Sequence, residues 1–135
     1  MLKKVIEFTD YNGVERKETH WFNLSEAELT EMQLEVDGGL AEYIMRISEE
    51  QSGPKIIKMF KDIILRAYGI KSDDGRRFIK TEKLKEEFAQ TEAYSKLFME
   101  LAQDADKAAE FINGIVPNNV KGKVDPKALH PALDK

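Results

Sequence analysis

The chain has 135 residues, a length typical of a single domain with one hydrophobic core. Apolar residues make up 41% and charged residues 34%, a balance that excludes a wholly disordered chain. The absence of cysteine excludes disulfide frameworks and thiolate metal sites, and a net charge of -4 disfavours nucleic-acid binding through a generally basic surface.

The N-terminal residues 1–5 have no long apolar run and no small-residue cleavage site, so they do not read as a signal peptide. No stretch of the sequence approaches the roughly 18 apolar residues that span a bilayer. We therefore expect a soluble, intracellular protein without membrane contacts.

Residues 2–22 are predicted to form a β-hairpin. Asn12 and Gly13 tolerate positive φ, and this dipeptide is the strongest short-range hairpin signal. One parity of the first strand is mostly apolar: Leu2, Ile6 and Phe8. The middle of the second strand, residues 15–18, is charged on both faces. An isolated ribbon of two strands is marginal in water, so we expect it to pack on helices or pair with another chain.

The first helix is predicted to follow Ser25, whose side chain would cap it. Glu28, three residues later, completes a capping box. We expect this helix to end near Gly38, where glycine can adopt the left-handed conformation. A second helix over about 40–50 is predicted from apolar residues at helical spacing: Leu40, Tyr43, Ile44 and Ile47.

The strongest helix prediction follows Ser52, Gly53 and Pro54. Proline is tolerated in the first turn because its missing N–H would have no intrahelical partner there. A wide apolar stripe predicts that this helix is the centre of the core: Ile56, Ile57, Phe60, Ile63, Ile64, Ala67 and Tyr68. We expect Gly69 to end the helix as a left-handed cap, with Ile70 making the hydrophobic contact after it.

After a charged turn over residues 71–77, Phe78 and Ile79 are expected to be extended. Three further helices are predicted from their N-caps: Thr81, Thr91 and Asp104. Together these elements predict an α+β, mainly α fold. Residues 1–116 would form a single globular helical domain with an N-terminal β-hairpin and five or six short helices.

Residues 117–135 are predicted to form an extended, flexible C-terminal arm. They carry three of the four prolines, and four lysines against two aspartates give the segment a net charge of +2. The arm is either a frayed terminus or a docking segment for a partner. The second interpretation rests on apolar residues that a solvating tail would not need: Val120, Val124, Leu129 and Leu133.

No catalytic or metal-binding constellation is readable, and we expect no catalytic residue, no metal and no cofactor. The two histidines, His20 and His130, lie far apart in the sequence. Residues 73–75 resemble the start of a calcium loop, but Thr81 stands where such a loop needs glutamate. A tight turn is the preferred interpretation there.

A local basic cluster could contact an acidic partner or a nucleic-acid backbone: Arg76, Arg77, Lys80, Lys83 and Lys85. Glu82, Glu86 and Glu87 are interleaved with it, so a solvated helix face is the preferred interpretation. Nucleic-acid binding through this cluster would predict steeply salt-dependent retention on DNA.

An ordered set of segments runs from the hairpin to Pro117: KVIEFTDYNG at 4–13, FNLSEAEL at 22–29, GGL at 38–40, FKDIIL at 60–65, SDDGRRF at 72–78, FAQTEAYS at 88–95, FMELA at 98–102 and FINGIVP at 111–117. This set spans about 116 of the 135 residues. It resembles the tail assembly chaperones of long-tailed, siphovirus-like phages and prophages of Gram-positive bacteria.

The resemblance implies a non-enzymatic assembly factor that acts in the bacterial host cytoplasm and is not retained in the mature virion. It implies binding and solubilisation of the tape measure protein, recruitment of the tail tube protein, and in related systems a frameshifted longer form of the chain itself. Apolar helix faces that the core does not require also make a homo-oligomer a possible state of the protein. The alternatives are a structural head–tail or tail completion protein retained in the virion, or a small hydrolase or metal-dependent enzyme.

A chaperone of an amphipathic helix needs exposed apolar surface with a charged rim. Many copies along one rod-like client can hold it through weak individual contacts. We expect the client surface on the helix after Thr91 and on the C-terminal arm, at five apolar residues: Tyr94, Phe98, Leu101, Leu129 and Leu133.

Overall fold

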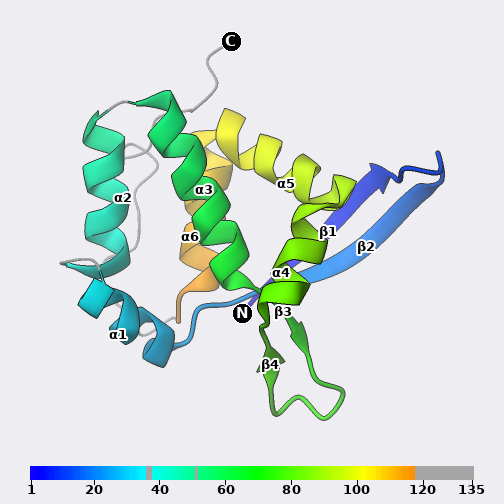
Figure 1. Ribbon diagram of the computed structural model, residues 1–135, viewed down its shortest axis with the longest axis horizontal. Coiled ribbons are helices and arrows are strands. Elements are labelled where there is room, and N and C mark those ends of the chain that lie inside the picture. The colour runs from blue at the N-terminus through cyan, green and yellow to red at the C-terminus, as the bar shows by residue number, and fades with distance from the viewer. Residues whose placement is uncertain (36–37, 51, 118–135) are drawn as a thin grey trace.

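The computed structural model describes residues 1–35, 38–50 and 52–117. Its elements follow the chain in this order: β1 (Leu2–Thr9), β2 (Glu15–Phe22), α1 (Glu26–Glu35), α2 (Gly39–Glu50), α3 (Gly53–Ala67), β3 (Tyr68–Lys71), β4 (Phe78–Ile79), α4 (Glu82–Ala89), α5 (Glu92–Gln103) and α6 (Ala105–Ile115). The predicted mainly helical α+β fold, with an N-terminal hairpin and five or six helices, is confirmed over these ranges, where six helices are present (Figure 1). Beyond Pro117, the predicted arm lies outside the described residues.

The N-terminal hairpin forms as predicted. β1 and β2 pair antiparallel, from Leu2 opposite Phe22 to Thr9 opposite Glu15. In the turn, Gly13 has a φ of 80°, which favours glycine. The Asp10 carboxylate accepts hydrogen bonds from the N–H groups of Asn12 and Val14, both at 2.9 Å, so the turn is held by its own side chain.

The sheet has four antiparallel strands in the order β1-β2-β3-β4. β2 and β3 pair at only two positions, Trp21 opposite Gly69 and Phe22 opposite Tyr68. β3 then pairs with β4 to form a second hairpin. The two hairpins therefore share a base and point apart from it, as Figure 1 shows.

The predicted end of α3 was wrong. The helix ends at Ala67, and Tyr68 is already extended, with φ of −67° and ψ of 142°. Gly69 has no positive φ and lies within β3, and Ile70 is 43% exposed instead of packing back on the helix. The cause is long-range. The N–H of Tyr68 still donates to the Ile64 carbonyl oxygen, but Tyr68 then pairs with Phe22, 46 residues earlier, and the chain continues as a strand.

Gly69 is needed for a different reason, which is close packing between β3 and β4. A Cβ atom at this position would lie 2.7 Å from Cε2 of Phe78 and 3.0 Å from the carbonyl oxygen of Ile79. The aromatic ring could move, but the backbone oxygen belongs to the paired strand. The glycine therefore allows the second hairpin to close.

We expect Gly69→Ala to lower the free energy of unfolding by about 1–3 kcal/mol, because the added methyl group overpacks this contact. Urea unfolding measures the loss. In a Phe78→Ala background the penalty should be smaller, because the closest atom is gone. Equal penalties in both backgrounds would show that Phe78 is not the cause.

The core lies between the inner face of the sheet and the helices. α5 and α6 contact β1, α4 contacts β3, and α3 contacts α2 and α5. The predicted central role of α3 is confirmed, because its apolar stripe is buried: Ile56, Met59, Phe60, Ile63, Ile64 and Ala67. The stacked rings of Tyr68 and Phe88, with centroids 4.1 Å apart, join the second hairpin to α4.

The four predicted N-caps are confirmed. Ser25 Oγ accepts the N–H of Glu28 at 3.1 Å, and the Glu28 carboxylate accepts the N–H of Ser25 at 3.0 Å. Thr81, Thr91 and Asp104 each accept backbone N–H groups from the first turn of the following helix. These caps fix where α1, α4, α5 and α6 begin.

Candidate protein-binding surface

The described residues bear on two questions, metal binding and membrane insertion. Among them, no group of three or more histidine, aspartate or glutamate side chains is placed to hold a metal ion. None of the helices over the same ranges is both long and apolar enough to cross a bilayer. His130 lies outside the described residues.

His20 packs against aromatic rings of the core. Its ring centroid lies 5.1 Å from that of Phe88 and 6.2 Å from that of Tyr68. Nε2 is 3.3 Å from the nearer carboxylate oxygen of Glu18. Burial lowers the pKa of His20, although the Glu18 carboxylate acts to raise it. The geometry gives this histidine a packing role.

The predicted client residues occupy different environments. Leu101 is 2% exposed and contributes to the core. Tyr94 and Phe98 are half-buried on α5, with ring centroids 6.0 Å apart, and burial raises the pKa of Tyr94. Leu129 and Leu133 lie outside the described residues. Only Tyr94 and Phe98 of the predicted set therefore present part of a side chain at the described surface.

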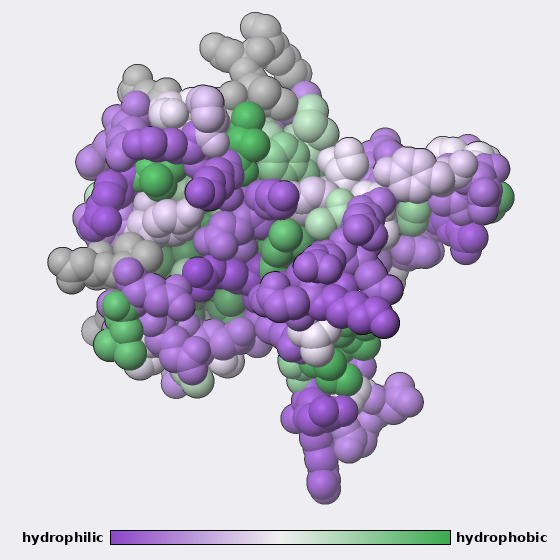
Figure 2. Space-filling model, viewed as in Figure 1, coloured by the Kyte–Doolittle hydropathy of each residue, from purple (hydrophilic) through white to green (hydrophobic). Residues whose placement is uncertain are grey.

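A groove of about 660 Å³ runs between α3 and α4. Nine residues line it: Lys58, Lys61, Asp62, Leu65, Arg66, Glu82, Lys85, Glu86 and Ala89. Leu65 and Ala89 are half-buried and supply the apolar part of the lining. The two helices lie on the face shown in Figure 2, which is mostly hydrophilic with small hydrophobic areas between the charged side chains.

Both rims of this groove carry charges of mixed sign, and their unpaired charges are opposite in sign. On α3, Arg66 is paired with Asp62 at 3.1 Å and with Glu35 at 3.0 Å. In contrast, Lys58 and Lys61 on the same helix, and Glu86 on α4, have no ion pair within the described ranges. The α3 rim is therefore open to acidic side chains of a partner, and the α4 rim is open to basic ones.

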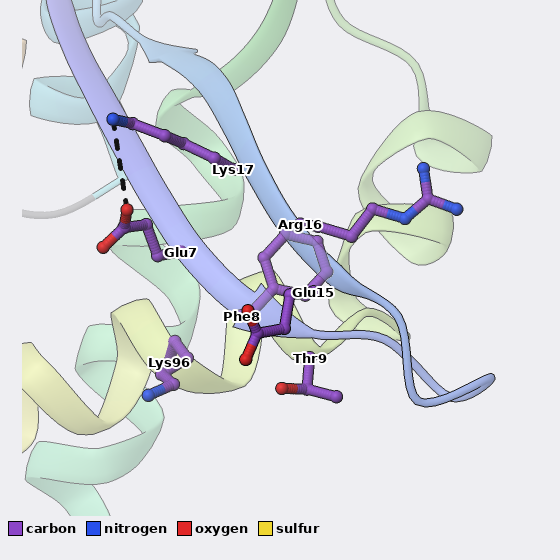
Figure 3. A pocket seen from close by; sticks show the side chains of 7 residues that line it. All are labelled: Glu7, Phe8, Thr9, Glu15, Arg16, Lys17 and Lys96. Carbon is purple, nitrogen blue, oxygen red and sulfur yellow. Dashed lines mark ion pairs between the residues drawn. The ribbon is translucent and has the colours of Figure 1, made fainter.

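A smaller pocket of about 390 Å³ lies at the outer part of the N-terminal hairpin (Figure 3). Its lining is Glu7, Phe8, Thr9, Glu15, Arg16, Lys17 and Lys96. Glu7 and Lys17 form an exposed ion pair at 4.0 Å. In Figure 3, Arg16 and Lys96 point away from each other, so these two cations do not converge on one point of the pocket.

Lys80 has a structural role that the sequence analysis missed. Its side chain is only 14% exposed, and Nζ donates to the carbonyl oxygens of Asn23 and Arg66, both at 2.7 Å, and to Oε2 of Glu28 at 2.6 Å. Placing Lys80 in a solvated basic cluster was wrong, because it joins the loop before α1, α1 itself and the end of α3. Because its neighbours in the sequence are charged, Lys80 resembles a surface residue, and the sequence does not reveal these distant partners.

The electrostatics of this contact follow from its burial. Burial lowers the pKa of Lys80, and the bond to Glu28 offsets only part of that effect. For Glu28, burial alone would raise the pKa, but hydrogen bonds from Lys80 and from the N–H of Ser25 bring it below its ordinary value. The Glu28 carboxylate is thus held in its charged form.

A family model described as phage tail assembly chaperone matches residues 1–132. No curated protein and no solved structure matches the chain. The matched range includes the N-terminal hairpin, the six helices of the described ranges and the α3–α4 groove.

Proposed function

The chain belongs to the phage tail assembly chaperone family, and from this premise we propose that it binds the tape measure protein, keeps it soluble and helps to recruit tail tube subunits. The observation that carries the proposal is the α3–α4 groove, which combines two apolar residues, Leu65 and Ala89, with charged rims. This is the chemistry that an amphipathic client helix requires.

The charges of the groove favour a particular orientation of the client helix. Acidic side chains along one edge of the client would meet Lys58 and Lys61, and basic side chains along the other edge would meet Glu86. Its apolar face would contact Leu65 and Ala89. Such a contact is weak alone, and many copies along one long client would supply the total affinity.

The remaining parts of the proposal concern location and further partners. We place the chain in the cytoplasm of a host of long-tailed phages or prophages, as a non-enzymatic factor that leaves before the virion matures. Tyr94 and Phe98 are proposed as additional client contacts because both residues are only half-buried. A frameshifted longer form of the chain and further copies of it are proposed as partners during assembly.

Co-expression with the tape measure protein encoded by the same phage tests the proposal. The full chain should increase the soluble fraction of that protein and elute with it from a sizing column. The double reversal Lys58→Glu with Lys61→Glu should weaken the complex about tenfold, which corresponds to about 1.4 kcal/mol. The matched control, Arg76→Glu with Arg77→Glu, makes the same change of charge on the β3–β4 loop and should bind normally.

Three results would contradict the proposed chaperone function or its binding site. Unchanged solubility together with no co-eluting complex would contradict tape measure binding itself. Equal weakening by both charge reversals would contradict the groove as its site. Stoichiometric amounts of the chain in purified virions, measured by mass spectrometry, would support a retained structural component of the tail instead of a chaperone.

A further inference from the structure

The two β-hairpins separate into a fork that leaves one edge of β2 open. β2 pairs with β3 only at Trp21 and Phe22, where the two arms meet. From Glu15 to His20, no other strand of the described ranges lies on that side of β2. Figure 1 shows the β1–β2 arm and the β3–β4 arm pointing in different directions from this base. Backbone groups on the open edge are therefore available to an additional strand.

A pocket of about 310 Å³ lies at the base of this fork. Both arms line it: Thr19, His20, Trp21, Tyr68, Gly69, Ile70 and Lys71. Ile70 is exposed although it is a large apolar residue, and Figure 2 shows a hydrophobic area at the base of the lower arm. The pocket is large enough for an apolar side chain, and the open strand edge lies directly beside it.

The face of the fork that carries Trp21 is positive, although the chain as a whole has a net charge of -4. The Glu18 carboxylate lies on the opposite face of β2, beside His20. Lys71 Nζ lies 4.9 Å from the centroid of the Trp21 ring. Lys3 is opposite Trp21 on β1 and therefore on the same face of the sheet. Within the described part of the chain, neither lysine is ion-paired with a carboxylate. Lys71 thus lies against the aromatic ring, and Lys3 holds the cross-strand position on the same face.

We propose that the fork binds an extended, acidic segment of a partner protein by addition of a strand to β2. Main-chain hydrogen bonds to the open edge would hold the segment, and one of its apolar side chains would enter the pocket beside Ile70. A neighbouring carboxylate would pair with Lys71 or Lys3. This site shares no lining residue with the α3–α4 groove, so the proposal goes beyond the function proposed above.

The structure favours an extended occupant over two other kinds. A helix uses its backbone N–H groups internally, so it would leave the open edge of β2 without new partners. A nucleic acid would have to approach a chain of net charge -4, and within the described ranges the unpaired lysines at the Trp21 face of the fork are Lys3 and Lys71. An extended acidic peptide can both form backbone hydrogen bonds with the open edge of β2 and pair its carboxylates with the lysines.

The test uses the full chain, labelled with ¹⁵N, and two synthetic peptides. One peptide alternates valine and glutamate over six residues, and the other alternates valine and lysine. Trp21 is the only tryptophan in the chain, so its emission reports directly on this pocket. The valine–glutamate peptide should shift that emission and the amide resonances of Thr19, Ile70 and Lys71, and the valine–lysine peptide should not.

Variants separate the fork from general charge effects. Lys71→Glu should weaken binding of the valine–glutamate peptide at least tenfold, and Ile70→Ser should also weaken it. Lys83→Glu, on α4, makes the same change of charge outside the fork and should bind normally. The proposal is overturned by unchanged Trp21 emission and amide resonances at millimolar peptide, by equal binding of both peptides, or by equal weakening in the Lys71 and Lys83 variants.

Discussion

Lys80→Met is expected to lower the free energy of unfolding by about 3 kcal/mol. Methionine keeps most of the side-chain volume but removes the ammonium group that satisfies three oxygen acceptors, on Asn23, Arg66 and Glu28. The Arg66 carbonyl lies at the end of α3, where carbonyl groups have no intrahelical partner. Leaving such groups buried and unpaired costs about 1–3 kcal/mol each, which partial hydration would reduce.

Urea denaturation measures this effect, and the chain supplies a matched control. Lys83→Met makes the same substitution at an exposed lysine of α4 and should change the free energy of unfolding by less than about 0.5 kcal/mol. If the two variants unfold at the same urea concentration, Lys80 does not hold these elements together.

The difference in unfolding free energy between the wild type and Lys80→Met should depend on pH. The pKa of Glu28 is lowered in the folded protein from an ordinary value of 4.5, so its contribution to stability is present above about pH 4.5. That contribution is lost as the pH falls through the lowered pKa, because protonated Glu28 no longer pairs with Lys80. The difference in stability between the wild type and Lys80→Met should therefore shrink in acid. A constant difference would mean that Glu28 contributes nothing.

The elements that the sequence predicts well are those whose causes are local. The cap at Ser25 depends on Glu28, three residues away, and Thr81, Thr91 and Asp104 act within one helical turn. The alternation of β1 likewise predicts its buried face. Each of these signals lies within a window that a single sequence displays, and no tertiary contact overrides it.

The errors arise where the deciding partner is distant. Gly69 reads as a helix cap, but the pairing of Tyr68 with Phe22 determines the backbone there. Lys80 reads as a surface charge, but two of its acceptors, on Asn23 and Glu28, are 57 and 52 residues away. No local pattern carries such information, because it depends on how the elements pack.

The candidate binding surface also has features that the local sequence predicts and features that depend on how the helices pack. Helical spacing correctly places Tyr94, Phe98 and Leu101 near one another on α5, but it does not show which of them faces the core. The α3–α4 groove is created by two helices that are separated by the second hairpin in the sequence. Its lining could therefore be identified only after the helices were placed.

Ile63→Asp is expected to remove at least about 4 kcal/mol of stability, the largest effect of any substitution considered. Ile63 is 1% exposed at the centre of α3, so aspartate would lose its packing and bury a carboxylate without a partner. Circular dichroism should show that the variant is already largely unfolded at room temperature, with no cooperative unfolding transition. A folded Ile63→Asp variant with a normal urea midpoint would contradict the placement of α3 in the core.

Leu65→Asp, two residues away on the same helix, separates folding from binding. Leu65 is half-buried and lines the α3–α4 groove, so its carboxylate could reach water, and the expected loss of stability is smaller, about 1–2 kcal/mol. This variant should remain folded yet fail to solubilise the tape measure protein, because an acidic group would replace the apolar contact of the client. Normal client binding by folded Leu65→Asp would exclude the groove, whereas Ile63→Asp would lose binding only because the domain itself is lost.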